Sequence, residues 1–115
     1  TDHDRLAQVF INLIANAQKY CDADRPELTI DVSRRGGRVI VDFIDNGSGI
    51  PPQAQSMVFE KFYRVADRQA GGAGLGLAIC REIMARLGGT LGYLPGQGGA
   101  AFRVSLPAAQ RMAAQ

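Results

Sequence analysis

The sequence has little that would mark a secreted, metal-binding or membrane-spanning protein. It contains two cysteines, Cys21 and Cys80, and neither has a second ligand nearby at metal-binding spacing. A disulfide framework and a zinc site are therefore not indicated. No apolar run approaches the ~20 residues needed to cross a bilayer, and no signal-peptide pattern opens the chain. We expect reduced thiols in a cytoplasmic domain.

An excess of one charge is also missing. The 13 Lys and Arg residues nearly balance the 11 Asp and Glu residues, giving a net charge of +2. The basic residues are scattered, and only Arg34 and Arg35 are adjacent. A nucleic-acid-binding surface would gather them on one face, so no nucleic acid is expected as a partner.

What remains is the composition of one ordinary globular domain. The chain has 115 residues, of which 46% are hydrophobic and 21% charged, and this length fits a single core. We assign residues 1–107 to the domain. Residues 108–115 are rich in Ala and Gln and are expected to form a frayed C-terminal tail.

Hydrophobic periodicity predicts the elements of an α+β fold. Apolar residues at helical spacing predict helices over residues 4–21, 52–62 and 75–87. Alternating apolar residues predict two hairpins, with strands over 27–33, 38–44, 90–94 and 101–106. Because βαβ spacing is missing, we expect a two-layer α/β sandwich, with helices on one face of a mixed, mostly antiparallel sheet.

A narrow polar stripe runs along the first predicted helix, and apolar residues flank it on both sides. Its members are Arg5, Gln8, Asn12, Asn16 and Lys19. Enclosed polar groups need partners. Two interpretations stay open: side chains bonded to nearby backbone, or a ligand site in which an amide oxygen holds a metal and an ammonium holds a phosphate.

Two glycine-rich segments carry further signals. In residues 45–50 (DNGSGI), Gly47 and Gly49 allow a close approach to a flat ligand, and the Asp45 carboxylate can accept a hydrogen bond from an exocyclic amine. Alone, this segment is also compatible with a simple turn. In residues 71–77 (GGAGLGL), a helix start offers N–H groups to phosphate oxygens. That segment matches neither a Walker loop nor a Rossmann fingerprint.

The order of these segments resembles the catalytic ATP-binding domain of sensor histidine kinases, in the GHKL ATPase superfamily. Residues 12–20 look like the N box, 45–50 like the first glycine box, 59–64 like the F box and 72–79 like the second glycine box. Gly98 and Gly99 resemble the trailing glycine motif. The similarity extends from about residue 2 to 107 and implies the Bergerat fold, with ATP between the N-box helix and a lid.

The resemblance implies roles for the N-box residues. Asn16 would bind Mg²⁺, with Asn12 as an accessory amide one turn earlier. Lys19 would contact phosphate, and Tyr20 would line the nucleotide pocket. Together with Arg64, Asn16 and Lys19 form the expected catalytic set.

The other boxes supply the remaining expected contacts with the nucleotide. Asp45 would recognise the adenine amino group, with Gly47, Gly49 and Ile50 forming that wall. Phe59 and Phe62 would anchor the lid, which spans residues 63–74 and is expected to be mobile without a ligand. The second glycine box would contribute Gly72, Gly74, Leu75, Gly76 and Leu77.

The resemblance also implies a reaction and partners. The domain would bind Mg-ATP and donate its γ-phosphate to a histidine on a separate dimerisation domain, in a full-length homodimer that then serves a response regulator. His3 is the only histidine here. The fragment itself is expected to be monomeric, and the full-length protein could be anchored in the inner membrane.

Residue 12 bears on the type of chemistry. Hydrolytic members of the superfamily carry a Glu general base one turn before the metal-binding Asn, whereas a neutral Asn12 cannot take a proton. This favours a histidine kinase over a hydrolase. The alternatives are a non-catalytic ATP-gated binding module and an anti-sigma-type serine kinase.

Two departures from the family pattern stand out. Ala73 occupies a position often held by Thr or Ser, which removes one hydroxyl donor. The strand that usually precedes the first helix is missing from this sequence, so we expect an open edge of the sheet.

Overall fold

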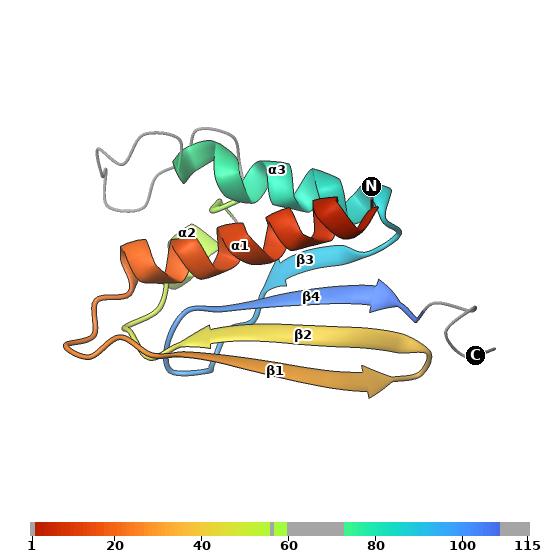
Figure 1. Cartoon of the computed structure of the whole chain (residues 1–115). Helices are drawn as coiled ribbons and strands as arrows, with labels where there is room; N and C mark the ends of the chain where they lie inside the picture. Colours follow the sequence, from red (N-terminus) through yellow and green to blue (C-terminus); the bar gives the residue numbers. More distant parts are fainter. Residues whose placement is uncertain (1, 56, 60–72, 109–115) are drawn as a thin grey trace.

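The computed structural model describes residues 2–55, 57–59 and 73–108 (Figure 1). The chain order is helix, hairpin, two helices, then a second pair of strands. The elements are α1 (Asp2–Tyr20), β1 (Leu28–Arg35), β2 (Arg38–Asp45), α2 (Pro52–Gln55), α3 (Ala73–Arg86), β3 (Thr90–Tyr93) and β4 (Ala101–Pro107).

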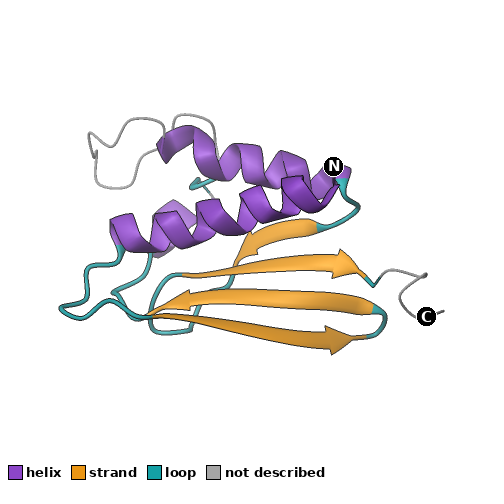
Figure 2. Ribbon diagram, viewed as in Figure 1, coloured by secondary structure: helices purple, strands orange, loops and turns teal. Residues whose placement is uncertain are grey.

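The four strands form one sheet in the order β1-β2-β4-β3. Helices α1 and α3 lie side by side across one face of it, as Figure 2 shows. The predicted two-layer sandwich is confirmed. The sheet was expected to be mixed and mostly antiparallel, and every pairing among the described strands is antiparallel, as hairpin-connected strands favour.

The core lies between these two layers. Strand alternation turns Val41 and Phe43 of β2 toward the helices, where Val104 and Phe102 of β4 are their cross-strand neighbours. Helix α1 adds Leu13, and α3 adds further apolar residues at i, i+3 and i+4 spacing. The buried residues of the helices are Val9, Leu13, Leu77, Ala78, Cys80, Ile83 and Met84.

The alternation of β2 continues to its last residue. Asp45 is in phase with Val41 and Phe43, and only 8% of it is exposed. The same pleat that builds the core therefore turns a carboxylate toward α1 at the end of the strand. This feature of the fold creates the site described below.

The second predicted helix is shorter than expected. Helix α2 ends at Gln55, and the described residues 57–59 form a turn. The Met57 amide donates to the carbonyl of Ala54 at 3.0 Å, an i to i−3 bond that tightens the chain. The prediction of a helix over residues 52–62 was thus wrong at its centre, where a turn places Val58 and Phe59 in the core. Its last residues, 60–62, lie outside the described part.

The outer strand β1 is largely uncovered. Ile30 and Val32 share the helix-facing side with Phe43 and Val41, their partners on β2, yet 46% and 69% of them are exposed. Helix α1 packs closely on β2, and the residue of β1 that lies beside α1 is Leu28. Within the described ranges, no helix has both the length and the apolar character to cross a membrane.

Candidate functional site

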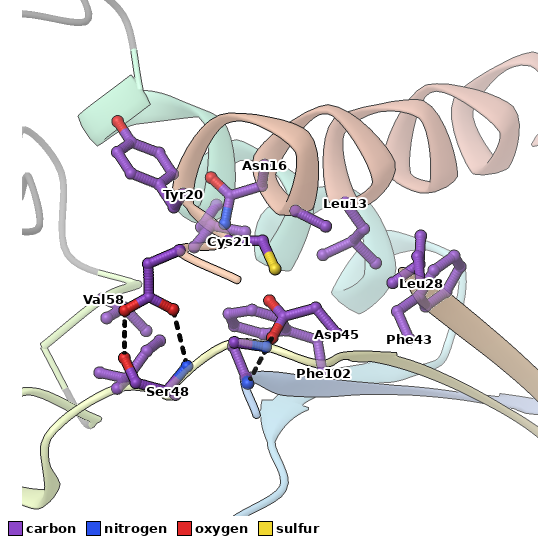
Figure 3. Close-up of a pocket in the computed structure, with 17 residues that line it drawn as sticks. Leu13, Asn16, Tyr20, Cys21, Leu28, Phe43, Asp45, Ser48, Val58 and Phe102 are labelled. Carbon is purple, nitrogen blue, oxygen red and sulfur yellow. Dashed lines mark hydrogen bonds between the residues drawn. The ribbon is translucent and has the colours of Figure 1, made fainter. Parts of the chain in front are cut away.

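A pocket opens between the C-terminal half of α1 and the end of β2 (Figure 3). It has a cavity volume of about 70 Å³, and its floor and walls are largely apolar. Leu13, Phe43, Val58, Leu77 and Phe102 provide these walls. Polar side chains interrupt them, namely Asn16, Tyr20, Asp22, Asp45 and Ser48. An apolar slot with a few fixed polar groups suits a flat organic ring.

Asp45 is the most tightly held of these polar groups. Its Oδ1 accepts hydrogen bonds from the backbone amides of Gly47 and Ala100, both at 2.9 Å. Its Oδ2 accepts none from the part of the chain that the structure describes, and Figure 3 shows it turned toward α1. The carboxylate is therefore fixed through one oxygen and can accept from a ligand donor through the other.

Two glycines make room for this carboxylate. A Cβ placed on Gly99 would collide with the carbonyl oxygen of Asp45 and would come within 2.6 Å of its Oδ1. A Cβ on Gly47 would lie 2.7 Å from Oδ1 of Asp22. Both contacts are closer than real Cβ atoms tolerate, so a larger residue at either position would displace the site.

Asp22 links the chain after α1 to the loop after β2. Its Oδ1 accepts from the Ser48 amide at 2.8 Å, and its Oδ2 accepts from the Ser48 hydroxyl at 2.6 Å. The hydroxyl bond, followed by the amide bond, lowers the pKa of Asp22. We call this pair of bonds the Asp22–Ser48 clasp.

The N-box residues divide into two groups. Asn16 and Tyr20 line the pocket, and the buried Tyr20 hydroxyl has no hydrogen-bond partner among the described residues. Asn12 and Lys19 are not among the lining residues. Lys19 is exposed, and the Asn12 amide donates to the Cys80 sulfur at 3.4 Å. Burial raises the pKa of the Cys80 thiol, an effect that this bond partly offsets.

The first glycine box lines the pocket, whereas Phe59, the described residue of the F box, does not. Gly47, Gly49 and Ile50 line the pocket. Phe59 packs edge-on against Phe102, a lining residue, with ring centroids 6.0 Å apart. The guanidinium carbon of Arg81 lies 4.3 Å from the centre of the Phe59 ring, a distance at which a cation attracts an aromatic face.

Several predicted residues cannot be placed. Phe62, Arg64, Gly72 and most of the expected lid lie outside the described residues. Gly74, Leu75 and Gly76 belong to the first turn of α3, and Leu77, one residue further, lines the pocket.

Sequence reasoning missed the side chains that support the motifs. Cys21, Asp22, Leu28 and Ser48 line the pocket, as does Ala100, whose amide holds Asp45. Tyr93 is a further case, since its hydroxyl accepts from the Ile50 amide at 3.2 Å. These contacts join segments distant in sequence, so no local pattern indicates them.

Comparisons with known proteins agree on one family. The family described as histidine kinase-, DNA gyrase B- and HSP90-like ATPase matches residues 1–110. The sensor protein KdpD of Escherichia coli (strain K12) is 45% identical over 102 residues, which are 87% of this chain and 11% of that protein. This chain thus spans about a tenth of that relative's length.

Solved structures give the same result. The mycobacterial sensor histidine kinase MprB superposes with a TM-score of 0.80 at 30% identity, over 93% of this chain and 74% of that one. Full-length ShkA, crystallised in complex with AMPPNP, gives a TM-score of 0.70 at 36% identity, over 90% of this chain and 21% of that one.

Proposed function

Because this chain belongs to the histidine kinase-, DNA gyrase B- and HSP90-like ATPase family, we propose that it binds Mg-ATP and donates the γ-phosphate to a histidine on a separate dimerisation domain. The resemblance to histidine kinase catalytic domains, inferred from the four boxes, is confirmed by the family match and by the structural neighbours. The metal, the acceptor and the partners are our proposal.

The half-satisfied Asp45 carboxylate carries the proposal. Its Oδ1 is engaged by two backbone amides, which leaves Oδ2 to accept from the pocket. The exocyclic amine of adenine is a donor of the right kind, and the apolar walls suit its ring. Guanine and hypoxanthine present an oxygen at that position, which a carboxylate would repel. The AMPPNP complex of ShkA supports the same ligand class, since AMPPNP is an ATP analogue.

Asn16 would hold the metal in this scheme. Its amide lines the pocket one helical turn before Tyr20, and Mg²⁺ characteristically combines one or two protein oxygens with phosphate oxygens and water. When bound, Mg²⁺ neutralises charge on the phosphates. Lys19 and Arg64 would supply further positive charge, as expected from the sequence.

Phosphoryl transfer then needs little acid–base help from this domain. The acceptor imidazole nitrogen forms a bond to the γ-phosphorus while the bond to the bridging oxygen breaks, and that electron pair leaves with ADP. A neutral imidazole nitrogen already has a free electron pair, so positioning and charge neutralisation carry the step. The step therefore requires no general base at position 12, where the Asn12 amide bonds to Cys80.

The partners follow from the longer relatives. KdpD is called a sensor protein, and this chain covers 11% of it, so the acceptor histidine would lie in another part of the full protein. We propose a homodimeric sensor kinase that serves a response regulator. Its catalytic domain would lie on the cytoplasmic side of an inner membrane.

A transfer assay tests this function. The chain is mixed with its dimerisation domain and γ-labelled ATP, and acid-labile, base-stable phosphate is expected on that domain. Asp45→Asn and Asn16→Ala should each abolish most of the transfer, whereas Asp31→Asn, on the exposed face of β1, should not. Acid-stable phosphate on serine would instead favour the serine kinase. ATP binding without any transfer would favour the binding module.

A further inference from the structure

We infer that Asp22 is a positioning residue that fixes the adenine-recognising carboxylate through Ser48 and thereby sets the choice of nucleobase. This inference rests on the proposed adenine-nucleotide binding. Asp22 lies in none of the four boxes and follows α1 by two residues. Both of its carboxylate oxygens are used by a single residue of the loop after β2.

The Asp22–Ser48 clasp holds the backbone of that loop. An amide and a hydroxyl donating to one carboxylate fix both the position and the rotation of Ser48. Asp22 is exposed to solvent, and its two charge-assisted bonds are short, at 2.6 and 2.8 Å. They lower the pKa of Asp22 from its ordinary value of 3.8. Asp22 is therefore ionised at neutral pH, and the clasp weakens only as the pH falls through that lowered pKa.

Gly47 connects the clasp to Asp45. Gly47 directly precedes Ser48, and its amide donates to Oδ1 of Asp45 at 2.9 Å. The Asp22 carboxylate also lies against Gly47, since a Cβ there would meet its Oδ1 at 2.7 Å. Fixing Ser48 therefore fixes the peptide whose N–H orients the recognising carboxylate.

Asp22 is itself held in place, as a positioning residue must be. The Asn46 side chain accepts from the amide of Glu27 and donates to the carbonyl of Arg25, both at 2.9 Å. It also accepts from the Cys21 thiol at 3.3 Å. These bonds tie residues 21–27 to the end of β2, so the clasp acts between two anchored segments.

A specific consequence distinguishes positioning from mere support. If Asp22 only stabilised the loop, its loss would weaken the binding of all nucleotides equally. If Asp22 orients Asp45, its loss should weaken only the binding of a ligand that donates to Asp45. ADP has that amine, and inosine diphosphate has a carbonyl oxygen in its place, while the ribose and phosphates are identical.

The experiment measures ADP and inosine diphosphate affinities by calorimetry at pH 7.5. The wild type should prefer ADP. Asp22→Ala should lower the affinity for ADP about fivefold, which corresponds to roughly one net hydrogen bond. Its affinity for inosine diphosphate should stay within about twofold of the wild-type value. Asp22→Asn keeps an acceptor for the Ser48 amide and a donor for its hydroxyl, so it should restore the preference for ADP.

Further variants complete the design. Asp24→Ala removes the same charge from an exposed position in the same segment and should behave as the wild type. Adding Ser48→Ala to Asp22→Ala should cause no further loss of ADP affinity, because the two residues act as one unit. Thermal melting shows whether each variant is folded. If Asp22→Ala does not fold, Ser48→Ala alone, which removes the hydroxyl bond of the clasp, provides the test and should lower the affinity for ADP but not for inosine diphosphate.

Equal losses for both nucleotides in folded Asp22→Ala would overturn the positioning role and leave the proposed function intact. A wild-type chain that binds neither nucleotide would instead overturn the proposed function, and this role with it.

Discussion

Gly99 illustrates how one residue supports the site without touching a ligand. It is buried against the backbone and carboxylate of Asp45, where a Cβ has no room. We expect Gly99→Ala to lower the free energy of unfolding by about 1–3 kcal/mol, as overpacking does. We also expect ADP affinity to fall about tenfold, because Asp45 must move. Urea denaturation and calorimetry measure the two effects.

Gly92 is the matched control for this substitution. It lies in β3, has no unusual backbone angle, and a Cβ there would meet nothing within 4 Å. Gly92→Ala should change the free energy of unfolding by less than about 0.5 kcal/mol and leave ADP binding unchanged. Equal effects of the two substitutions would contradict the steric argument.

The two cysteines should differ in reactivity. Cys80 is fully buried and its thiol pKa is raised by burial, so its thiolate is scarce and covered. Cys21 is half-buried and lines the pocket. Iodoacetamide at pH 8 should therefore modify Cys21 first, and ADP at ten times its Kd should slow that reaction about tenfold.

Peptide mass spectrometry follows both sites in that experiment. Cys21→Ser is the control and should show no fast, ADP-sensitive modification. Alkylation of Cys21 at the same rate with and without bound ADP would mean that the nucleotide lies elsewhere.

At this scale the sequence predicts the residues within motifs better than their supports. Asp45 could be predicted because a carboxylate, two glycines and a preceding strand stand together in the chain. Asp22 and Ala100 could not, because they meet the motif only through tertiary packing, across 26 and 55 residues. Asn12 stands in the predicted motif, yet its amide bonds to Cys80 of α3.

Among the elements, the pair of central strands offers a test of electrostatics. Asp42 of β2 and Arg103 of β4 are directly opposite in register and form two bonds, of 2.8 and 2.9 Å. The bond from the guanidinium to Asp42 raises the pKa of Arg103. Asp42→Asn should lower the free energy of unfolding by about 0.5–1 kcal/mol, and by less in 1 M NaCl.

Asp31→Asn is the matched control for this pair. Asp31 of β1 is the cross-strand neighbour of Asp42 on its other side, and like charges at that position repel. Removing its charge should therefore leave stability unchanged or raise it slightly. Urea denaturation at low and high salt compares the variants, and equal destabilisation by both would contradict the register-based argument.

The elements themselves were predictable in kind and less so in extent. All four strands and both long helices were expected within about two residues, because period and turn signals agree in each. The prediction of a helix over residues 52–62 was wrong because Val58 and Phe59 are buried in the core from a turn. The spacing of apolar residues alone cannot distinguish a turn that buries them from a helix that buries them.

For the whole molecule, ligand binding should be visible as stability. A ligand present at 100 times its Kd stabilises a folded protein by about 2.7 kcal/mol. For a domain of this size that corresponds to a rise in Tm of about 10 °C. We expect ADP with Mg²⁺ to give this shift in a thermal melt, and GDP at the same concentration to give little. Equal shifts would contradict adenine recognition by Asp45.

The bond between Asp45 and the amide of Ala100 joins residues 55 positions apart, and this separation has a kinetic consequence. Contacts of high sequence separation form late, since the loop between them must first be closed. A chain emerging from the ribosome cannot complete the carboxylate's cradle until β4 has been synthesised and has paired with β2. Nucleotide therefore cannot guide the early stages of folding. It should slow unfolding and leave the early part of refolding unchanged, because the carboxylate's cradle needs residues from both ends of this long connection.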